Sequence, residues 1–301
     1  MNRPAPLFRL LLACACLGLG FARLSAQEAD LRPLLDGLAH LPNASLRYTV
    51  RYHQSDLPAP TTTDYAFCHC DGAFYIKRYR HSASQPACDP DLLVEWLAFD
   101  GEVFQLYHRD ANLIVMGKDA AGPRLRPFVQ SLFAFHPWFC SIWHAFFLGS
   151  KELFCLPGIC TAGSLFQAAP DLARVAGGTR VQLQRTSPHW SRVHITLDAA
   201  ARLPVRVLTE VLPEKKETLV EVTQWSRPWP LNQAPAFIYP LHTRQTLTLL
   251  EGGAARPVFE ILVDPAHATP ADNVPPAEFT IPQTLARRVI NLDTQTTMEI
   301  R

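Results

Sequence analysis

The sequence predicts a mainly β protein with a single curved antiparallel sheet that forms an unclosed half-barrel, covered by a few helices. Two observations support this prediction: segments of alternating apolar and polar residues recur along the chain, and short turns separate most of them. Strands that follow one another through short turns favour antiparallel pairing over a parallel α/β sheet. The roughly 275 residues beyond the leader described below are enough for one domain.

The first elements are a helix, a strand and two hairpins. Residues 30–41 are expected to form a short helix, because Asp30 can cap it and four leucines lie on one face. Segment 46–52 alternates apolar with polar residues, which is typical of a strand with one buried face. Each hairpin has an Asp-Gly turn in which both residues are expected to adopt positive φ. The turns Asp71-Gly72 and Asp100-Gly101 connect residues 64–70 to 73–80 and residues 92–99 to 102–108.

Further strands are expected on both sides of an insertion. A turn at 109–112 leads into a strand at 113–116, and the strands resume after Gly177-Gly178. The expected later pairs are 179–186 with 191–197, 203–212 with 218–225, 238–250 with 257–263, and a last pair within 289–300. The proline-rich residues 265–276 predict a surface loop. About a dozen strands are expected in total.

The insertion at about residues 128–167 is mostly apolar and aromatic and loses the strand alternation. Its densest part contains the residues predicted to bind a ligand: Phe133, Phe135, Trp138, Phe139, Trp143, Phe146 and Phe147. Two interpretations stay open. The aromatic side chains either fill the open side of the sheet as core, or form a lid or groove for an apolar ligand or membrane surface. Pro137 and the polar residues of this segment argue against a membrane span.

The N-terminus has the three parts of a secretory signal peptide. Arg3 and Arg9 precede an apolar stretch over residues 10–22, and Ser25-Ala26 provides small residues for cleavage before Gln27. We expect residues 1–26 to be removed, residues 27–301 to form one domain, and the protein to reside in the periplasm or cell envelope. Lipidation at Cys14 and an uncut membrane anchor are the less favoured alternatives.

Six cysteines follow the leader: Cys68, Cys70, Cys88, Cys140, Cys155 and Cys160. An even number in an exported protein predicts disulfides, because that compartment is oxidising. We expect at least two bridges, and Cys68 or Cys70 with Cys88 is the simplest early pair. With three cysteines in each cluster, one bridge must connect the clusters or two thiols must stay free.

Several function classes find no support. Beyond the leader the chain has 25 basic and 27 acidic residues, so a formal charge of −2 gives no electrostatic basis for binding nucleic acid. No Gly-x-Ser-x-Gly, His-Glu-x-x-His or phosphate-binding glycine loop is present. Cys68-His69-Cys70 has the residue types of a zinc site without its spacing. We therefore expect no enzyme activity, no metal and no cofactor.

Three stretches resemble the outer-membrane lipoprotein-sorting (LolA-type) family in its broad sense, which includes LolB-type acceptors and RseB-type sensors. They are the expected helix leading into Leu46–Tyr52, the strand pair Val193–Asp198 and Arg202–Val207, and Pro276–Pro282 before the terminal strands. The resemblance implies an unclosed half-barrel whose cavity holds acyl chains. The Cys- and Trp-rich insertion departs from the plain carriers and puts a lipoprotein shuttle role in doubt.

Together these inferences favour an envelope protein that holds an apolar ligand, such as an acyl chain, lipid or lipoprotein, on the concave face of a half-barrel. The alternative is a structural or sensory envelope protein that binds a protein partner through the aromatic insertion. Membrane contact is expected to be peripheral at most.

Overall fold

A computed structural model describes residues 43–54, 57–119, seven positions between 125 and 137, three strands between 172 and 197, and residues 204–300 with gaps at 212–214, 227–238, 250–252 and 272. The leader, the expected helix over 30–41 and the three later cysteines lie outside the described residues. No helix in the described part of the chain is both long and apolar enough to cross a membrane.

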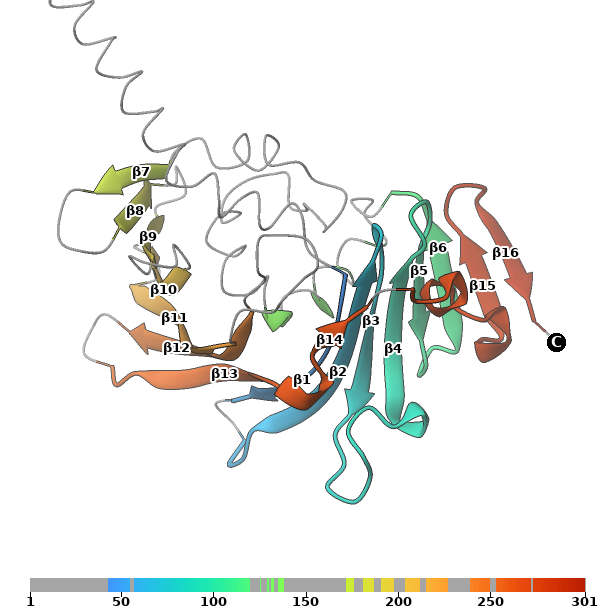
Figure 1. Cartoon of the computed structure of the whole chain (residues 1–301), viewed down its shortest axis with the longest axis horizontal. Helices are drawn as coiled ribbons and strands as arrows, with labels where there is room; N and C mark the ends of the chain where they lie inside the picture. Colours follow the sequence, from blue (N-terminus) through green and yellow to red (C-terminus); the bar gives the residue numbers. More distant parts are fainter. Residues whose placement is uncertain are drawn as a thin grey trace, which may run out of the picture.

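The described residues contain one sheet of sixteen strands, which curves around an open side (Figure 1). The strands of the first part are β1 Ala44–Tyr52, β2 Thr61–Cys70, β3 Ala73–Arg80, β4 Leu93–Phe99, β5 Phe104–His108 and β6 Leu113–Gly117. Those of the second part are β7 Leu172–Val175, β8 Val181–Thr186, β9 Ser191–Leu197, β10 Pro204–Val211, β11 Lys216–Trp225, β12 Pro240–Leu249 and β13 Arg256–Val263. The C-terminal segment adds β14 Thr269–Pro270, β15 Arg288–Asn291 and β16 Thr296–Glu299.

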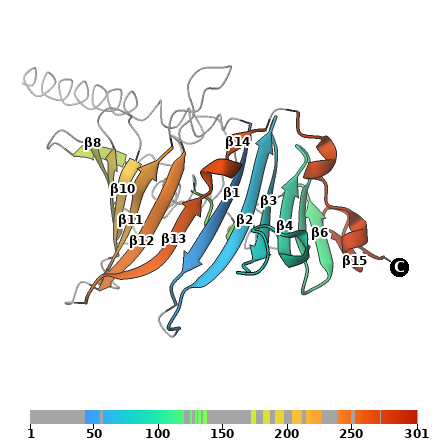
Figure 2. The same cartoon turned by 60° about the horizontal axis from the view of Figure 1, so that its bottom comes forward.

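The strand order explains how one sheet is built from two series of hairpins. The chain starts at the middle with β1, runs outward to β6, resumes at the opposite edge with β7, and returns to the middle, where β13 pairs with β1 (Figure 2). All of these pairings are antiparallel, as predicted. The exception is β15, which pairs in parallel with β6 and carries β16 at the edge.

The alternation in β1 gives the buried face that the sequence predicts. Leu46, Tyr48 and Val50 are buried, whereas Arg47 and Arg51 on the other face are exposed. Alternate side chains of a strand point to opposite faces, so one register places all three apolar residues on the concave side. Tyr52 is the exception, with 37% exposure at the end of the strand.

The two Asp-Gly hairpins differ in their turns. At the first, Asp71 has φ 49° and Gly72 has φ 85°, as the two-residue turn requires. At the second, only Gly101 has positive φ, which corrects the prediction for Asp100. The Asp100 carboxylate instead accepts hydrogen bonds from the backbone N–H groups of Glu102 and Val103, at 2.9 and 2.8 Å. This longer loop delays the start of β5 to Phe104.

Residues 264–300, here called the C-terminal strap, begin with the predicted surface loop: residues 265–276 are mostly exposed, and Ala271 among them is buried. Short 3-10 turns at Pro265–His267, Pro276–Phe279 and Gln283–Leu285 lead the strap across the convex face. Its β14 pairs with β1, and Ile281, Ala286 and Val289 are buried against Trp96 and neighbouring residues of β4–β6. The strap thus supplies the core of the convex side.

Candidate functional site

An apolar row crosses the concave face of the first half of the sheet. Phe67, Ile76, Leu97 and Leu106 lie directly opposite one another on β2 to β5, and each is at most 2% exposed. A parallel row of phenylalanines follows, in which Phe99 lies 5.6 Å from Phe74 and 4.3 Å from Phe104 between ring centroids. Neighbouring strands therefore form a continuous apolar layer on the concave face, and this layer is buried in the structure.

The start of the aromatic insertion lies on this surface. The His136 ring is 4.3 Å from the Phe67 ring and meets it edge to face. Phe135 lies 5.4 Å from Phe259 of β13 and 6.2 Å from Tyr52 of β1, so it contacts the two strands that join the halves of the sheet. The short segments of this region appear within the curve of the sheet (Figure 1).

His136 is fully buried, and burial lowers its pKa to about 3. The ring is therefore neutral at neutral pH and packs as an aromatic group between strands β1 and β2. This environment provides no charged acid for chemistry. His144, the other histidine of the insertion, lies outside the described residues.

One end of the concave face is polar. The Glu95 carboxylate is nearly buried and lies 3.0 Å from the Arg78 guanidinium and 3.3 Å from His108 Nε2. Tyr65 joins this cluster through Arg78 and stacks on Tyr48 at 5.0 Å, and burial raises its pKa to about 12. The face thus changes from apolar to charged along its strands, as a surface for an amphiphilic molecule would.

Phe135 is the one predicted binding residue among those the structure describes. Phe133, Trp138, Phe139, Trp143, Phe146 and Phe147 lie outside the described residues. Sequence reasoning did not include the partners of Phe135, namely Tyr52 and Phe259, because the pairing of β1 with β13 joins segments far apart in the chain. The strand alternation could have identified their face, though not their proximity.

The early cysteines do not form the expected bridge. Cys68, Cys70 and Cys88 are free thiols. Cys68 and Cys70 lie on the convex face of β2, buried with Ala271 and Phe279 of the strap. Burial raises the pKa of Cys68 to about 12 and that of Cys88 to about 11.

Other predictions about the cysteines have different outcomes. The expectation of at least two disulfides involves Cys140, Cys155 and Cys160, which lie outside the described residues, and stays a prediction. Among the described residues no group of three or more His, Cys, Asp or Glu side chains is arranged to hold a metal ion.

Comparison with known proteins gives structural likeness without sequence likeness. No protein-family model matches the chain, and no curated protein sequence matches it. The solved structures that resemble it include an outer-membrane lipoprotein-sorting protein domain from Vibrio parahaemolyticus, with 9% identity, a TM-score of 0.45, and coverage of 84% of this chain and 95% of that one.

Two further solved structures are similar at the same level. A LolA superfamily protein from Nitrosomonas europaea is 10% identical with a TM-score of 0.39, and the match covers 84% of this chain and 97% of that one. A DUF1329 family protein from Desulfovibrio piger is 10% identical with a TM-score of 0.39, covering 83% and 95%. With TM-scores below 0.5, the function proposed next is drawn from the chain's own residues.

Proposed function

We propose that this chain is an exported binding protein of the cell envelope that holds an apolar ligand, such as an acyl chain, on the concave face of its sheet. The observation that carries the proposal is the apolar row Phe67, Ile76, Leu97 and Leu106 on the concave face of a curved sheet. Each of these side chains is at most 2% exposed, so a ligand would take the place of the segment that covers the row. A strongly curved sheet cannot fill its own concave side with side chains at native density, so another segment or a ligand must complete it.

The aromatic insertion is the segment that shares this face with the ligand. Phe135 contacts Tyr52 and Phe259, which lie directly opposite each other where β1 meets β13. These are apolar ring contacts, which an apolar ligand could replace with contacts of the same kind. The insertion is therefore proposed as the cover of the ligand.

A binding role is also favoured over catalysis. The buried histidine of this face, His136, is held neutral by burial, and the polar cluster of Glu95, Arg78 and His108 is internally paired. Paired groups of this kind orient a headgroup more readily than they transfer a proton to a substrate. Export to the envelope is proposed from the leader over residues 1–26.

The test is lipid binding by protein purified from its own envelope. Native mass spectrometry should detect a co-purified lipid, and a fluorescent fatty acid should bind the delipidated protein. Phe135→Ala should weaken probe binding several-fold, and Trp138→Ala combined with Trp143→Ala should weaken it further. Leu285→Ala is the matched control, because Leu285 is an exposed apolar residue of the strap with 39% exposure.

The outcome separates the proposal from its alternative. If no lipid co-purifies and the aromatic variants bind the fatty acid as well as the unmodified protein, the proposal is wrong. A stable protein partner that is recovered by crosslinking, and lost on deleting residues 133–148 from a protein that still folds, would indicate the sensory or structural role instead.

A further inference from the structure

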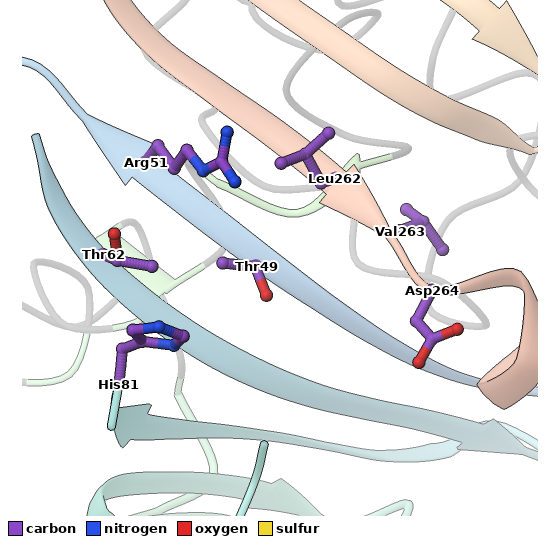
Figure 3. A pocket seen from close by; sticks show the side chains of 7 residues that line it. All are labelled: Thr49, Arg51, Thr62, His81, Leu262, Val263 and Asp264. Atoms are coloured by element: carbon purple, nitrogen blue, oxygen red, sulfur yellow. The ribbon is translucent and has the colours of Figure 1, made fainter. Parts of the chain in front are cut away.

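A polar groove lies on the convex face, on the opposite side of β1 from the apolar row. It consists of two adjoining hollows, of about 310 and 250 Å³, that share Thr49 and Asp264. Alternate residues of β1 form its floor, the segment after β3 forms one wall, and the end of β13 with the following turn forms the other (Figure 3). The groove is separate from the concave face by strand geometry.

Each hollow contains an imidazole that an aspartate orients. His81 Nδ1 lies 2.9 Å from Asp64, whose carboxylate is 2% exposed and also accepts a hydrogen bond from the Thr49 hydroxyl at 2.8 Å. His267 Nδ1 lies 2.7 Å from Asp264 in the same way. Because Nδ1 is engaged in both pairs, Nε2 is the nitrogen that each ring offers to a ligand.

Each hollow also contains one arginine. Arg51 lines the first and is half exposed, with its nearest carboxylate, Glu260, at 3.9 Å. Arg47 lines the second and is exposed, and no ion pair or hydrogen bond joins its side chain to another described residue. Arg47 is close enough to Asp264 to lower the pKa of that carboxyl, although the hydrogen bond from His267 lowers it more. Arg47 therefore keeps its hydrogen-bond donors for a ligand.

We propose that this groove binds an oxyanion of the phosphate class, either free in solution or as a lipid headgroup, through Arg47, His267, Arg51 and His81. An arginine fork matches a phosphate or carboxylate, and an imidazolium adds a charged donor beside it. The Asp64 carboxylate that orients His81 is buried and turned to its own partners. The Asp264 carboxylate, which lines both hollows and is 48% exposed, is paired with His267. This assignment is independent of the proposed ligand on the concave face.

The first experiment is calorimetric titration of the full mature chain with inorganic phosphate at low ionic strength. Arg47→Gln should weaken binding about tenfold, since a charge-assisted contact of this kind contributes on that scale. His267→Gln should also weaken binding, because it removes the imidazole that lines the second hollow. Arg288→Gln, an exposed arginine of β15 on another part of the sheet, is the matched control and should bind phosphate unchanged.

A second experiment identifies the source of the anion. Sedimentation with phosphatidylcholine vesicles, with and without phosphatidic acid, shows whether the groove accepts a lipid headgroup. If the protein binds the acidic vesicles, if phosphate competes with that binding, and if Arg47→Gln abolishes it, the ligand is a lipid headgroup. If the protein binds phosphate but not the vesicles, the ligand is a solute. If neither phosphate nor the acidic vesicles bind, the groove is not an oxyanion site. The same conclusion follows if the Arg47→Gln protein binds both probes as tightly as the unmodified protein does. Thermal unfolding of each variant verifies its fold.

Discussion

The two faces of the first half of the sheet are covered in different ways. On the convex face, the strap places Phe279, Ile281, Ala286 and Val289 against the strands, and each is at most 4% exposed. On the concave face, the described ring contacts come from Phe135 and His136 at the start of the insertion, and Leu125, Val129 and Leu132 of the same region are also buried. The convex side is thus closed by the chain's own terminus, and the proposed ligand would share the concave side with the insertion.

The strap is fixed by hydrogen bonds as well as by apolar contacts. The buried Gln105 side chain accepts a hydrogen bond from the backbone N–H of Ile281 at 3.0 Å. Lys118 N–H donates to the Asp293 carboxylate, and β15 continues the sheet beside β6. These bonds bind the strap at several points along its length. The contacts that the structure describes for Phe135 are ring contacts, made edge to face with Tyr52 and Phe259.

The largest expected effect is the loss of stability from Phe67→Ala. Phe67 is fully buried and contacts His136, so truncation should cost about 3–5 kcal/mol of the free energy of unfolding. Urea unfolding followed by far-UV circular dichroism measures this. A cost below about 1 kcal/mol would mean that the insertion is not packed on the concave face, and would break the comparison of the two faces.

A similar test on the convex face is Ile281→Ala. Ile281 is 2% exposed within the strap, so its truncation should cost about 2–4 kcal/mol in the same unfolding measurement. Leu285→Ala, in the same strap but exposed, should stay within about 0.5 kcal/mol. Fatty-acid binding by the folded Ile281→Ala protein should be unchanged. Weakened binding would show that the strap contributes to the ligand site.

The sequence predicted local features better than distant ones. The alternation of β1 and the Asp71-Gly72 hairpin depend on neighbouring residues, and the structure confirms both. Asp100 escaped prediction because its side chain caps the loop in place of a two-residue turn. The parallel pairing of β15 with β6 joins residues about 175 positions apart, and no local pattern specifies it.

The same distinction applies to the candidate sites. The aromatic insertion was visible in composition, and Phe135 lies on the predicted face. The groove was not visible, because its two His–Asp pairs are assembled from β2, the segment after β3, and the turn after β13. The burial of Cys68 and Cys70 was not visible for a related reason: the strap that covers them arrives from the far end of the chain.

Acid should destabilise the protein through His136. The folded protein holds this ring neutral down to a pH of about 3, whereas the unfolded chain protonates it near its ordinary pKa of 6.5. Between these values the unfolded state binds more protons, so stability is complete above about 6.5 and falls with pH by at most about 1.4 kcal/mol per pH unit. In urea unfolding measured from pH 7 to pH 4, His136→Phe should flatten this slope; the two pH limits of the slope hold to within about half a pH unit. An unchanged slope would contradict the burial of His136.

The smallest expected effect is the difference in stability between a Glu→Gln substitution on the concave face and one on the convex face. Glu95→Gln on the concave side removes the charge that holds Arg78 and His108, and should cost about 1–2 kcal/mol, a range reduced because Arg78 is one-third exposed. Glu260→Gln on the convex side affects the loose pair with Arg51 at 3.9 Å and should stay within about 0.5 kcal/mol. High salt should reduce the cost of Glu260→Gln further and leave most of the cost of Glu95→Gln, because nearly buried charges are screened less. Equal costs on the two faces would show that the polar end of the concave face is as open to water as the groove, and that the Glu95 cluster cannot orient a ligand headgroup.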